Sequence, residues 1–234
     1  MSKKRFLLKL SGEALAGDRK FGFSEETVQT VAKQVKQLTD LDVEVAIVIG
    51  GGNFWRGRTG ESMDRVKADQ IGMLATVMNC IYASDVFRRI GLATAIYTPF
   101  AVGAFTRLFS KDAAMADLNA GKVVFFAGGT GHPYFSTDTI TTLRAIEIEA
   151  DEILLAKAVD GVYDSDPKTN PNARRYDTIT LEAVIANRLQ VMDLTATILA
   201  CENRMPLRVF ALRGDNAIIN ALSDDFEGTL VTVE

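Results

Sequence analysis

The sequence predicts an α/β fold with a mostly parallel central sheet, because one unit recurs along the chain. The unit is a short apolar run, a turn rich in glycine or acidic residues, and a segment with helical periodicity. Strands are expected at residues 6–10, 43–49, 92–97, 123–127, 153–156 and 207–212. Helices are expected at residues 24–38, 64–90, 110–119, 138–150 and 192–202. The carboxyl ends of parallel strands meet at one edge of a sheet, so the turns after these strands are expected to gather there.

Local signals justify the elements in order. Three apolar runs, at residues 6–10, 43–49 and 123–127, each end at a turn that contains glycine. A continuous apolar run bounded by such a turn is typical of a buried strand. The first helix begins at the N-cap residue Ser24 and carries two glutamates in its first turn. In the long helix 64–90, which Gly91 ends, the apolar residues are expected to face the core. They are Ile71, Leu74, Ala75 and Met78.

The composition indicates an ordinary globular protein. The 234 residues are 47% hydrophobic and 24% charged, and no linker or charge block divides them, so a single domain spanning residues 1–234 is expected. The formal net charge of −4 disfavours a nonspecific nucleic-acid binder. The two cysteines, Cys80 and Cys201, form no CxxC motif, so buried thiols are favoured over a zinc site or a disulfide. The N-terminal apolar run is too short for a signal peptide or a membrane span, which favours a cytoplasmic protein without a membrane partner.

Several glycine-rich turns favour phosphate binding, because such turns expose backbone N–H groups. The P-loop pattern GxxxxGK[ST] is absent, as is a GxGxxG between a strand and a helix, which argues against a P-loop ATPase and a dinucleotide dehydrogenase. Residues 50–57 combine three successive glycines with Arg56, which suits a phosphate clamp, although a structural turn is the alternative. Lys9 in the first strand either reaches a transferred phosphoryl group or extends to solvent from an edge strand.

Two further segments carry candidate residues. Residues 128–138 combine backbone amides, hydroxyls and aromatic rings, which suits a nucleobase and its sugar phosphate. Within this segment Asp138 is either a ligand or a helix N-cap. His132 has no neighbouring nucleophile and is interpreted as a lining residue. Residues 160–167 indicate a hairpin-like turn with exposed carboxylates.

Five segments together resemble the bacterial uridylate (UMP) kinases of the amino acid kinase family. They are residues 9–13, 50–57, 72–79 and 129–138, and residues 159–163 with the following Asp166-Pro167. They occur in the family's order and spacing and cover essentially the whole chain. The resemblance implies a three-layer αβα amino acid kinase fold, with the phosphate acceptor bound by the N-terminal half and ATP by the C-terminal half.

The resemblance also implies roles for individual residues. The implied ATP-binding residues are Lys9, Leu10, Ser11, Gly12, Gly52, Arg56, Lys157, Tyr163 and Asp166. The implied UMP-binding residues are Gly51, Asp69, Thr130, Gly131, His132, Pro133, Tyr134, Phe135, Ser136 and Thr137. Lys9, Arg56 and Asp193 are implied as catalytic, with Asp193 holding Lys9 in position. A helix N-cap is the alternative for Asp193, and a solvated or helix-start carboxylate is the alternative for Asp69. Residues 155–158 depart from the pattern of some relatives, and Lys157 lies in this departure.

The implied reaction is in-line transfer of the γ-phosphoryl group of Mg-ATP to UMP, giving UDP and ADP in pyrimidine nucleotide biosynthesis. The acceptor phosphate is already anionic, so neither a general base nor a covalent intermediate is required. Mg²⁺ is expected to be held mainly by the nucleotide phosphates rather than by a protein metal site. A homohexamer, inhibition by UTP and activation by GTP are also implied, with residues 17–22 as an effector-linked loop. The small, apolar helix 72–79 favours self-association, although its face can equally belong to the core.

Two other functions remain as alternatives. The same fold can phosphorylate a carboxylate or a carbamate, as glutamate, acetylglutamate and aspartate kinases do, although Asp69 and a uridine-shaped pocket argue against this. A noncatalytic nucleotide sensor is the second alternative, although the presence of Lys9 and Arg56 argues against it.

Overall fold

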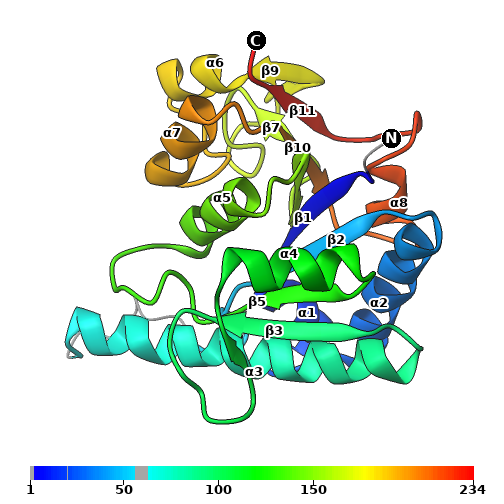
Figure 1. The fold of residues 1–234 in the computed structure, drawn as a ribbon. Helices are drawn as coiled ribbons and strands as arrows, with labels where there is room; N and C mark the ends of the chain where they lie inside the picture. The colour runs from blue at the N-terminus through cyan, green and yellow to red at the C-terminus, as the bar shows by residue number, and fades with distance from the viewer. Residues whose placement is uncertain (1–2, 20, 56–62) are drawn as a thin grey trace.

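The computed structural model describes residues 3–19, 21–55 and 63–234, and a nine-stranded sheet runs through its centre (Figure 1). The strands of this sheet are β1 (Arg5–Leu10), β2 (Glu44–Ile49), β3 (Thr94–Thr98), β4 (Arg107–Leu108), β5 (Val123–Phe126), β6 (Glu152–Lys157), β9 (Thr178–Thr180), β10 (Leu207–Ala211) and β11 (Thr229–Thr232). Their order across the sheet is β4-β3-β5-β2-β1-β6-β10-β11-β9. Only β10 and β11 pair antiparallel within this sheet of the described residues. The predicted, mostly parallel sheet is therefore confirmed.

Helices cover both faces of the sheet. They are α1 (Gly12–Ala16), α2 (Glu25–Asp40), α3 (Arg65–Arg89), α4 (Lys111–Asn119), α5 (Thr137–Glu147), α6 (Leu181–Ala186), α7 (Leu194–Glu202) and α8 (Ala217–Asn220), with a 3₁₀ turn at Gly17–Arg19. One core cluster joins the sheet to α2, α3 and α8, and a second joins it to α4, α5, α6 and α7. Side chains of β1 alternate between the two, since Phe6, Leu8 and Leu10 enter the first cluster and Leu7 the second. This arrangement is the predicted three-layer αβα fold.

The helices begin where the sequence places capping residues. Ser24 accepts a hydrogen bond from the Thr27 backbone N–H at the start of α2, and Asp64 does the same for Lys67 at the start of α3. The long helix α3 differs from its prediction in one respect. Ala75 is buried, but the side chains of Ile71, Leu74 and Met78 are 36%, 52% and 47% exposed, so these three residues are not part of the core.

Several short elements lie beyond what periodicity predicts. The hairpin-like turn at 160–167 contains β7 (Val162–Tyr163), which pairs antiparallel with β8 (Arg175–Tyr176), so the connection between the two strands is longer than expected. Strands of two to four residues, such as β4, β9 and β11, are too short to show a period in the sequence.

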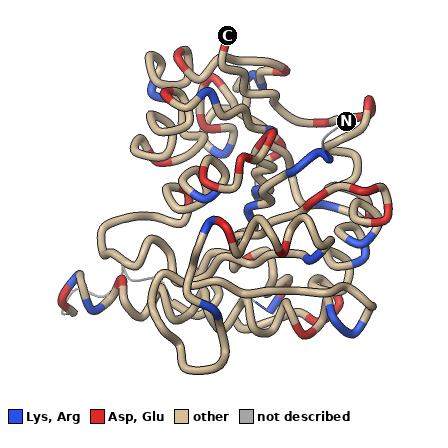
Figure 2. The backbone as a smooth tube through the Cα atoms, in the orientation of Figure 1, with Lys and Arg blue, Asp and Glu red and all other residues tan. Residues whose placement is uncertain are grey.

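Both cysteines are free thiols, with Cys80 buried and Cys201 partly buried. Burial raises the pKa of the Cys80 thiol, which keeps it protonated. No described helix is both long and apolar enough to cross a lipid bilayer. Basic and acidic residues are interspersed along the described backbone (Figure 2).

Candidate active site at the carboxyl edge of the sheet

A cavity of about 430 Å³ lies at the carboxyl edge, beyond the ends of β2 and β5 and between α3 and α5. Three segments line it: the glycine turn after β2, the first half of α3, and the segment that joins β5 to α5. The lining residues from these segments include Gly51, Gly52, Trp55, Arg65, Asp69, Gly72, Met73, Thr76, Gly129, Thr130, Phe135, Ser136 and Thr137. The cavity therefore lies where the sequence predicts the phosphate acceptor.

The glycines of the turns are required by close packing. A Cβ atom on Gly51 would lie 2.9 Å from the carbonyl oxygen of Gly72, and one on Gly12 would lie 2.4 Å from the carbonyl oxygen of Gly50. A Cβ on Gly52 would lie 3.1 Å from the Glu13 carboxylate. The turns after β1 and β2 thus pack so closely against each other and against α3 that these positions have no room for a side chain. This is a structural reason for glycine that the sequence prediction did not include. Arg56, the predicted phosphate clamp, lies outside the described residues.

Lys9 forms an ion pair at the end of β1. Its Nζ lies 2.9 Å from Asp138 Oδ1, and the two side chains are only 13% and 19% exposed. β1 lies between β2 and β6 in the middle of the sheet, so the alternative of an edge-strand lysine that extends to solvent is wrong. Asp138 is not the N-cap of α5 either, because Ser136 accepts hydrogen bonds from the backbone N–H groups of Asp138 and Thr139.

The expectation that Asp193 holds Lys9 is not met, because Asp138 is the carboxylate that pairs with this lysine. Asp193 is the N-cap of α7 and accepts from the backbone N–H of Ala196 at 3.0 Å. It also accepts from the hydroxyls of Ser136 and Thr139. Its carboxylate thus joins the starts of α5 and α7, and it touches the candidate site through Ser136.

Lys157 adds a second ammonium group. It ends β6, and its Nζ donates a hydrogen bond to the backbone carbonyl of Val191. Burial is the main cause that lowers the pKa of Lys157; the charge of Asp138 raises it and that of Lys9 lowers it further. Two ammonium groups and one carboxylate thus share the ends of β1 and β6, and such a cluster favours an added anion such as a phosphate.

Asp69 anchors the opposite wall of the cavity and is not a solvated carboxylate. Its Oδ2 accepts from the Tyr134 backbone N–H at 2.8 Å and from Arg65 Nε at 2.9 Å. The Arg65 guanidinium also lies over the Tyr134 ring, 5.2 Å from its centroid. Tyr134 has a φ of 73°, a left-handed conformation that costs energy in a non-glycine residue and that the bond to Asp69 stabilises.

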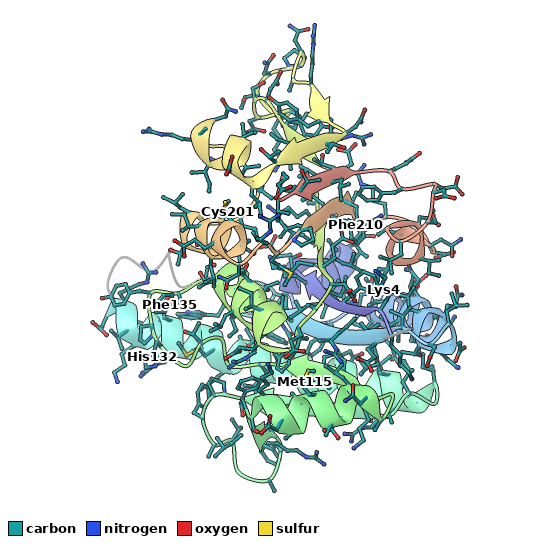
Figure 3. All side chains as sticks on the ribbon, turned by 45° about the horizontal axis from the view of Figure 1, so that its top comes forward. Lys4, Met115, His132, Phe135, Cys201 and Phe210 are labelled. Atoms are coloured by element: carbon teal, nitrogen blue, oxygen red, sulfur yellow. The ribbon has the colours of Figure 1, made fainter. Side chains whose placement is uncertain are left out.

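The segment from β5 to α5 supplies four of its predicted residues to the cavity: Thr130, Phe135, Ser136 and Thr137. Gly131, His132, Pro133 and Tyr134 do not line it. His132 instead lines an apolar hollow between α5 and α7, which shares Thr130 and Phe135 with the cavity. Figure 3 shows His132 and Phe135 in this connecting segment, beside α3.

On the other side of Lys9, the predicted ATP residues occupy the ends of β1, β6 and β7. Ser11 caps α1 by accepting from the Ala14 N–H at 3.0 Å, whereas Leu10 is 1% exposed and belongs to the core. The Tyr163 hydroxyl donates to Asp160 Oδ1 at 2.7 Å. Asp166 accepts from the Lys168 N–H at 2.9 Å, as a turn residue does.

A second polar cavity of about 390 Å³ lies beyond β6 and β10. Its lining includes Asp160, Phe210, Arg213, Asp215 and Asn216. The sequence analysis placed Asp160 in the turn at 160–167 but gave it no binding role, and it gave none to Phe210, Arg213, Asp215 and Asn216, whose spacing forms no motif. The available signal is that each residue lies in, or follows, a predicted parallel strand.

Comparisons with known proteins identify the family and the fold. The model of the amino acid kinase family matches residues 4–211. The crystal structure of UMP kinase from Ureaplasma parvum superposes with a TM-score of 0.94 at 35% identity, covering 99% of this chain and 100% of that chain. The crystal structure of UMP kinase from Bacillus anthracis superposes with a TM-score of 0.95 at 35% identity, covering 100% of this chain and 98% of that chain.

Proposed function

The chain belongs to the amino acid kinase family, and from that premise we propose that it transfers the γ-phosphoryl group of Mg-ATP to UMP, giving UDP and ADP. The observation that carries the proposal is the place of the Lys9, Asp138 and Lys157 cluster, which lies beside the acceptor cavity at the carboxyl edge of the sheet. The two similar structures, both UMP kinases, support UMP as the acceptor. A UMP kinase of this kind supplies UDP to pyrimidine nucleotide biosynthesis.

We assign the acceptor to the N-terminal half and ATP to the C-terminal half of one domain spanning residues 1–234. The acceptor cavity is lined by residues between Val48 and Ile140, and the polar cavity beyond β10 by residues between Asp160 and Glu227. Lys9, next to the last residue of β1, and Lys157, the last residue of β6, lie on adjacent strands between these two regions. The transferred phosphoryl group would therefore lie near the two ammonium groups.

The chemistry required of the protein is alignment and charge neutralisation. A phosphate oxygen of UMP is anionic near neutral pH and needs no general base to attack the γ-phosphorus. Lys9 and Lys157 would neutralise the charge that the two phosphate groups bring together, and the backbone amides of Gly12 and Gly52 would orient the phosphate oxygens. Asp193 would act on the site as a positioning residue, through Ser136.

Magnesium is expected to arrive with the nucleotide. The part of the chain that the structure describes has no group of three His, Cys, Asp or Glu side chains placed to hold a metal ion. When bound, Mg²⁺ neutralises charge on the β- and γ-phosphates. Lys9 and Lys157 would act beside it on oxygens that the ion leaves free.

The test is ADP release from purified protein with Mg-ATP and a panel of acceptors: UMP, CMP, dUMP, AMP, GMP, glutamate, acetylglutamate, aspartate and carbamate. UMP-dependent ADP, with UDP as the second product, is expected. Turnover with an amino acid or a carbamate would instead identify a different acceptor on the same fold. ATP binding without any turnover would identify a nucleotide sensor.

A pair of lysine variants tests the role of Lys9. Lys9→Ala is expected to lose at least about a hundredfold in kcat while UMP binding is mostly retained, because the charge acts on the transferred group. The control is Lys4→Ala, just before the other end of the same strand, where the side chain is 69% exposed. Figure 3 labels Lys4. Equal turnover in the two variants would remove Lys9 from the mechanism.

We also propose self-association through α3. Ile71, Leu74, Met78 and Ile81 are 36–52% exposed and lie at helical spacing along this helix; we call them the apolar stripe. Large apolar side chains at this spacing on a 25-residue helix fit the same helix of a second copy, as the first step towards the predicted homohexamer. Leu74→Glu is expected to lower the mass measured by light scattering. The control is Leu41→Glu, outside the stripe, where the leucine is 73% exposed against 52% for Leu74. A mass unchanged in both variants would refute the interface.

Regulation by GTP and UTP and a cytoplasmic location belong to the same proposal. Phe21, in the predicted effector-linked loop, packs against Phe54 with ring centroids 5.3 Å apart, which connects that loop to the glycine turn after β2. Activation by GTP and inhibition by UTP are expected in the same ADP-release assay. Cell fractionation tests the location.

A further inference from the structure

Two asparagine side chains lie buried beneath the glycine turns, and neither has a role in the sequence prediction. Asn53 follows the turn after β2 and is 1% exposed, and Asn79 lies on α3 and is 0% exposed. Asn53 Nδ2 donates to Asn79 Oδ1 at 2.9 Å, and Asn79 Nδ2 donates to Asn53 Oδ1 at 2.8 Å. The two amides thus form a reciprocal pair.

The second N–H of each amide reaches a backbone carbonyl. Asn53 Nδ2 donates to the carbonyl of Gly22 at 2.8 Å, and Asn79 Nδ2 donates to that of Gly50 at 2.7 Å. All four amide N–H groups of the pair therefore have acceptors, and each Oδ1 accepts one bond. A fully satisfied buried polar pair fixes a geometry more narrowly than apolar side chains of the same size, because hydrogen bonds are directional.

The pair touches both turns that approach the transferred phosphoryl group. Gly50 begins the turn after β2, and Gly12 lies in the turn after β1. Gly12 packs so closely against the pair that a Cβ atom on it would lie 2.4 Å from Asn53 Oδ1. The Gly50 backbone N–H also donates to the Leu10 carbonyl at 2.9 Å. In the proposed kinase, the relative position of these two turns would set the distance between the phosphate of UMP and the γ-phosphate of ATP.

We propose that the Asn53–Asn79 pair is a positioning device that fixes the separation of the two phosphate-binding turns, an inference that rests on the proposed kinase function. The pair does not line the acceptor cavity, so its effect is on alignment rather than on affinity. A misplacement of about 1 Å costs on the order of a hundredfold in rate. Loss of the pair should therefore lower kcat while substrate affinities stay nearly constant.

The experiment is a double-mutant cycle with Asn53→Ala, Asn79→Ala and the double variant. The control is Ser84→Ala, which removes a hydrogen bond of another buried polar residue of α3, the 2.7 Å bond between Ser84 and Thr94, far from the turns. We measure kcat with UMP, the dissociation constants of ATP and UMP by calorimetry, and thermal unfolding. Each single variant is expected to lose at least about tenfold in kcat with dissociation constants within about threefold of wild type. The kcat of the double variant is expected to lie within about threefold of the kcat of the less active single variant. The reason is that either single substitution already breaks the pair, so the second one has little left to remove.

Several outcomes would overturn the inference. They are an unchanged kcat, losses in kcat that multiply in the double variant, or affinities that fall as much as kcat. A loss in kcat that Ser84→Ala reproduces at equal destabilisation would also overturn it. If the alanine variants do not fold, Asn79→Asp keeps the shape but turns a carboxylate oxygen towards the Gly50 carbonyl, and the same selective loss of kcat is expected.

The wild-type panel keeps the two proposals distinguishable. A wild type that uses another acceptor refutes UMP as the substrate, and the variants assayed with that acceptor still test the pair. A wild type that is inactive with every acceptor refutes the kinase function and this inference with it.

Discussion

The ion pair between Lys9 and Asp138 yields a prediction that links stability to nucleotide binding. Asp138→Asn keeps the size of the side chain but leaves the ammonium groups of Lys9 and Lys157 close together without their shared carboxylate. We expect this variant to be less stable than wild type in the absence of nucleotide. We also expect the triphosphate of ATP to restore part of the lost stability, because it brings negative charge to the same place.

The magnitude follows from the geometry. At a separation of 2.9 Å, the Coulomb attraction is about 6 kcal/mol at an effective dielectric constant of about 20. Removal of one partner of a buried pair typically costs about 3–5 kcal/mol. The two side chains are 13% and 19% exposed, so solvent screening reduces the expected loss to about 2–3 kcal/mol. For a chain of 234 residues this corresponds to a fall in Tm of about 5–10 °C.

The assay is thermal unfolding with and without saturating Mg-ATP, and the chain offers a matched control. Asp112 is the second residue of α4 after the N-cap Ser110, as Asp138 is the second residue of α5 after the N-cap Ser136, but Asp112 is exposed. Asp112→Asn thus measures the loss of a helix-dipole interaction alone, about 0.3–1 kcal/mol. The reasoning is refuted if Asp138→Asn is no more destabilising than Asp112→Asn, or if Mg-ATP raises the Tm of Asp138→Asn no more than that of wild type.

Three further predictions concern single residues. Lys157→Met should raise the free energy of unfolding by about 1 kcal/mol at neutral pH while lowering kcat. Burial lowers the pKa of Lys157, so its charged form destabilises the fold at pH values below that pKa, and the destabilisation disappears as the pH rises and the amine loses its proton. Urea unfolding at neutral and alkaline pH checks it, and a less stable variant would contradict it. Gly51→Ala should lower kcat/KM for UMP, because the new Cβ would lie 2.9 Å from the Gly72 carbonyl oxygen. Gly72→Ala is the control: its Cβ would lie 3.8 Å from Trp55, so this variant should fold, with α3 stabilised by about 0.5–1 kcal/mol. Asp69→Asn should raise KM for UMP about tenfold with a smaller change in kcat, and an unchanged KM would leave Asp69 only its role in anchoring Tyr134.

Much of the fold could be predicted from the sequence because its central strands carry strong local signals. The apolar runs at 43–49 and 153–156 correspond to Glu44–Ile49 and Glu152–Lys157, since a strand covered on both faces has few polar residues. The prediction that Ile71, Leu74 and Met78 on α3 face the core was wrong, because an apolar helix face has the same sequence pattern in a core and in an interface. Strands as short as β4 and β9 owe their pairing to neighbours that are distant in sequence, and this pairing leaves no local period.

The partners of the site residues were harder to predict than the residues themselves. Lys9 could be singled out because a lysine in an apolar strand needs an anion, but its partner Asp138 is brought to it by the crossing of α5 over the sheet. Asp193 was assigned to Lys9 because nothing in the sequence shows that its carboxylate is occupied by the start of α7. The pairing of Asn53 with Asn79 depends on the angle between the turn and α3, which is a tertiary property.

Helix α3 connects two features that the sequence presents separately. From one face it holds two segments of the site through three hydrogen bonds. Asp69 and Thr76 bind the Tyr134 N–H and the Gly128 N–H of the β5–α5 segment, and Asn79 binds the Gly50 carbonyl of the turn after β2. At about 100° per residue, positions 69, 76 and 79 lie on the face opposite the apolar stripe. A second copy packed on the stripe would therefore restrain the helix that fixes both segments. It follows that Leu74→Glu should lower turnover as well as mass, whereas Leu41→Glu should change neither, and a fully active Leu74→Glu monomer would show that α3 is rigid enough without a partner.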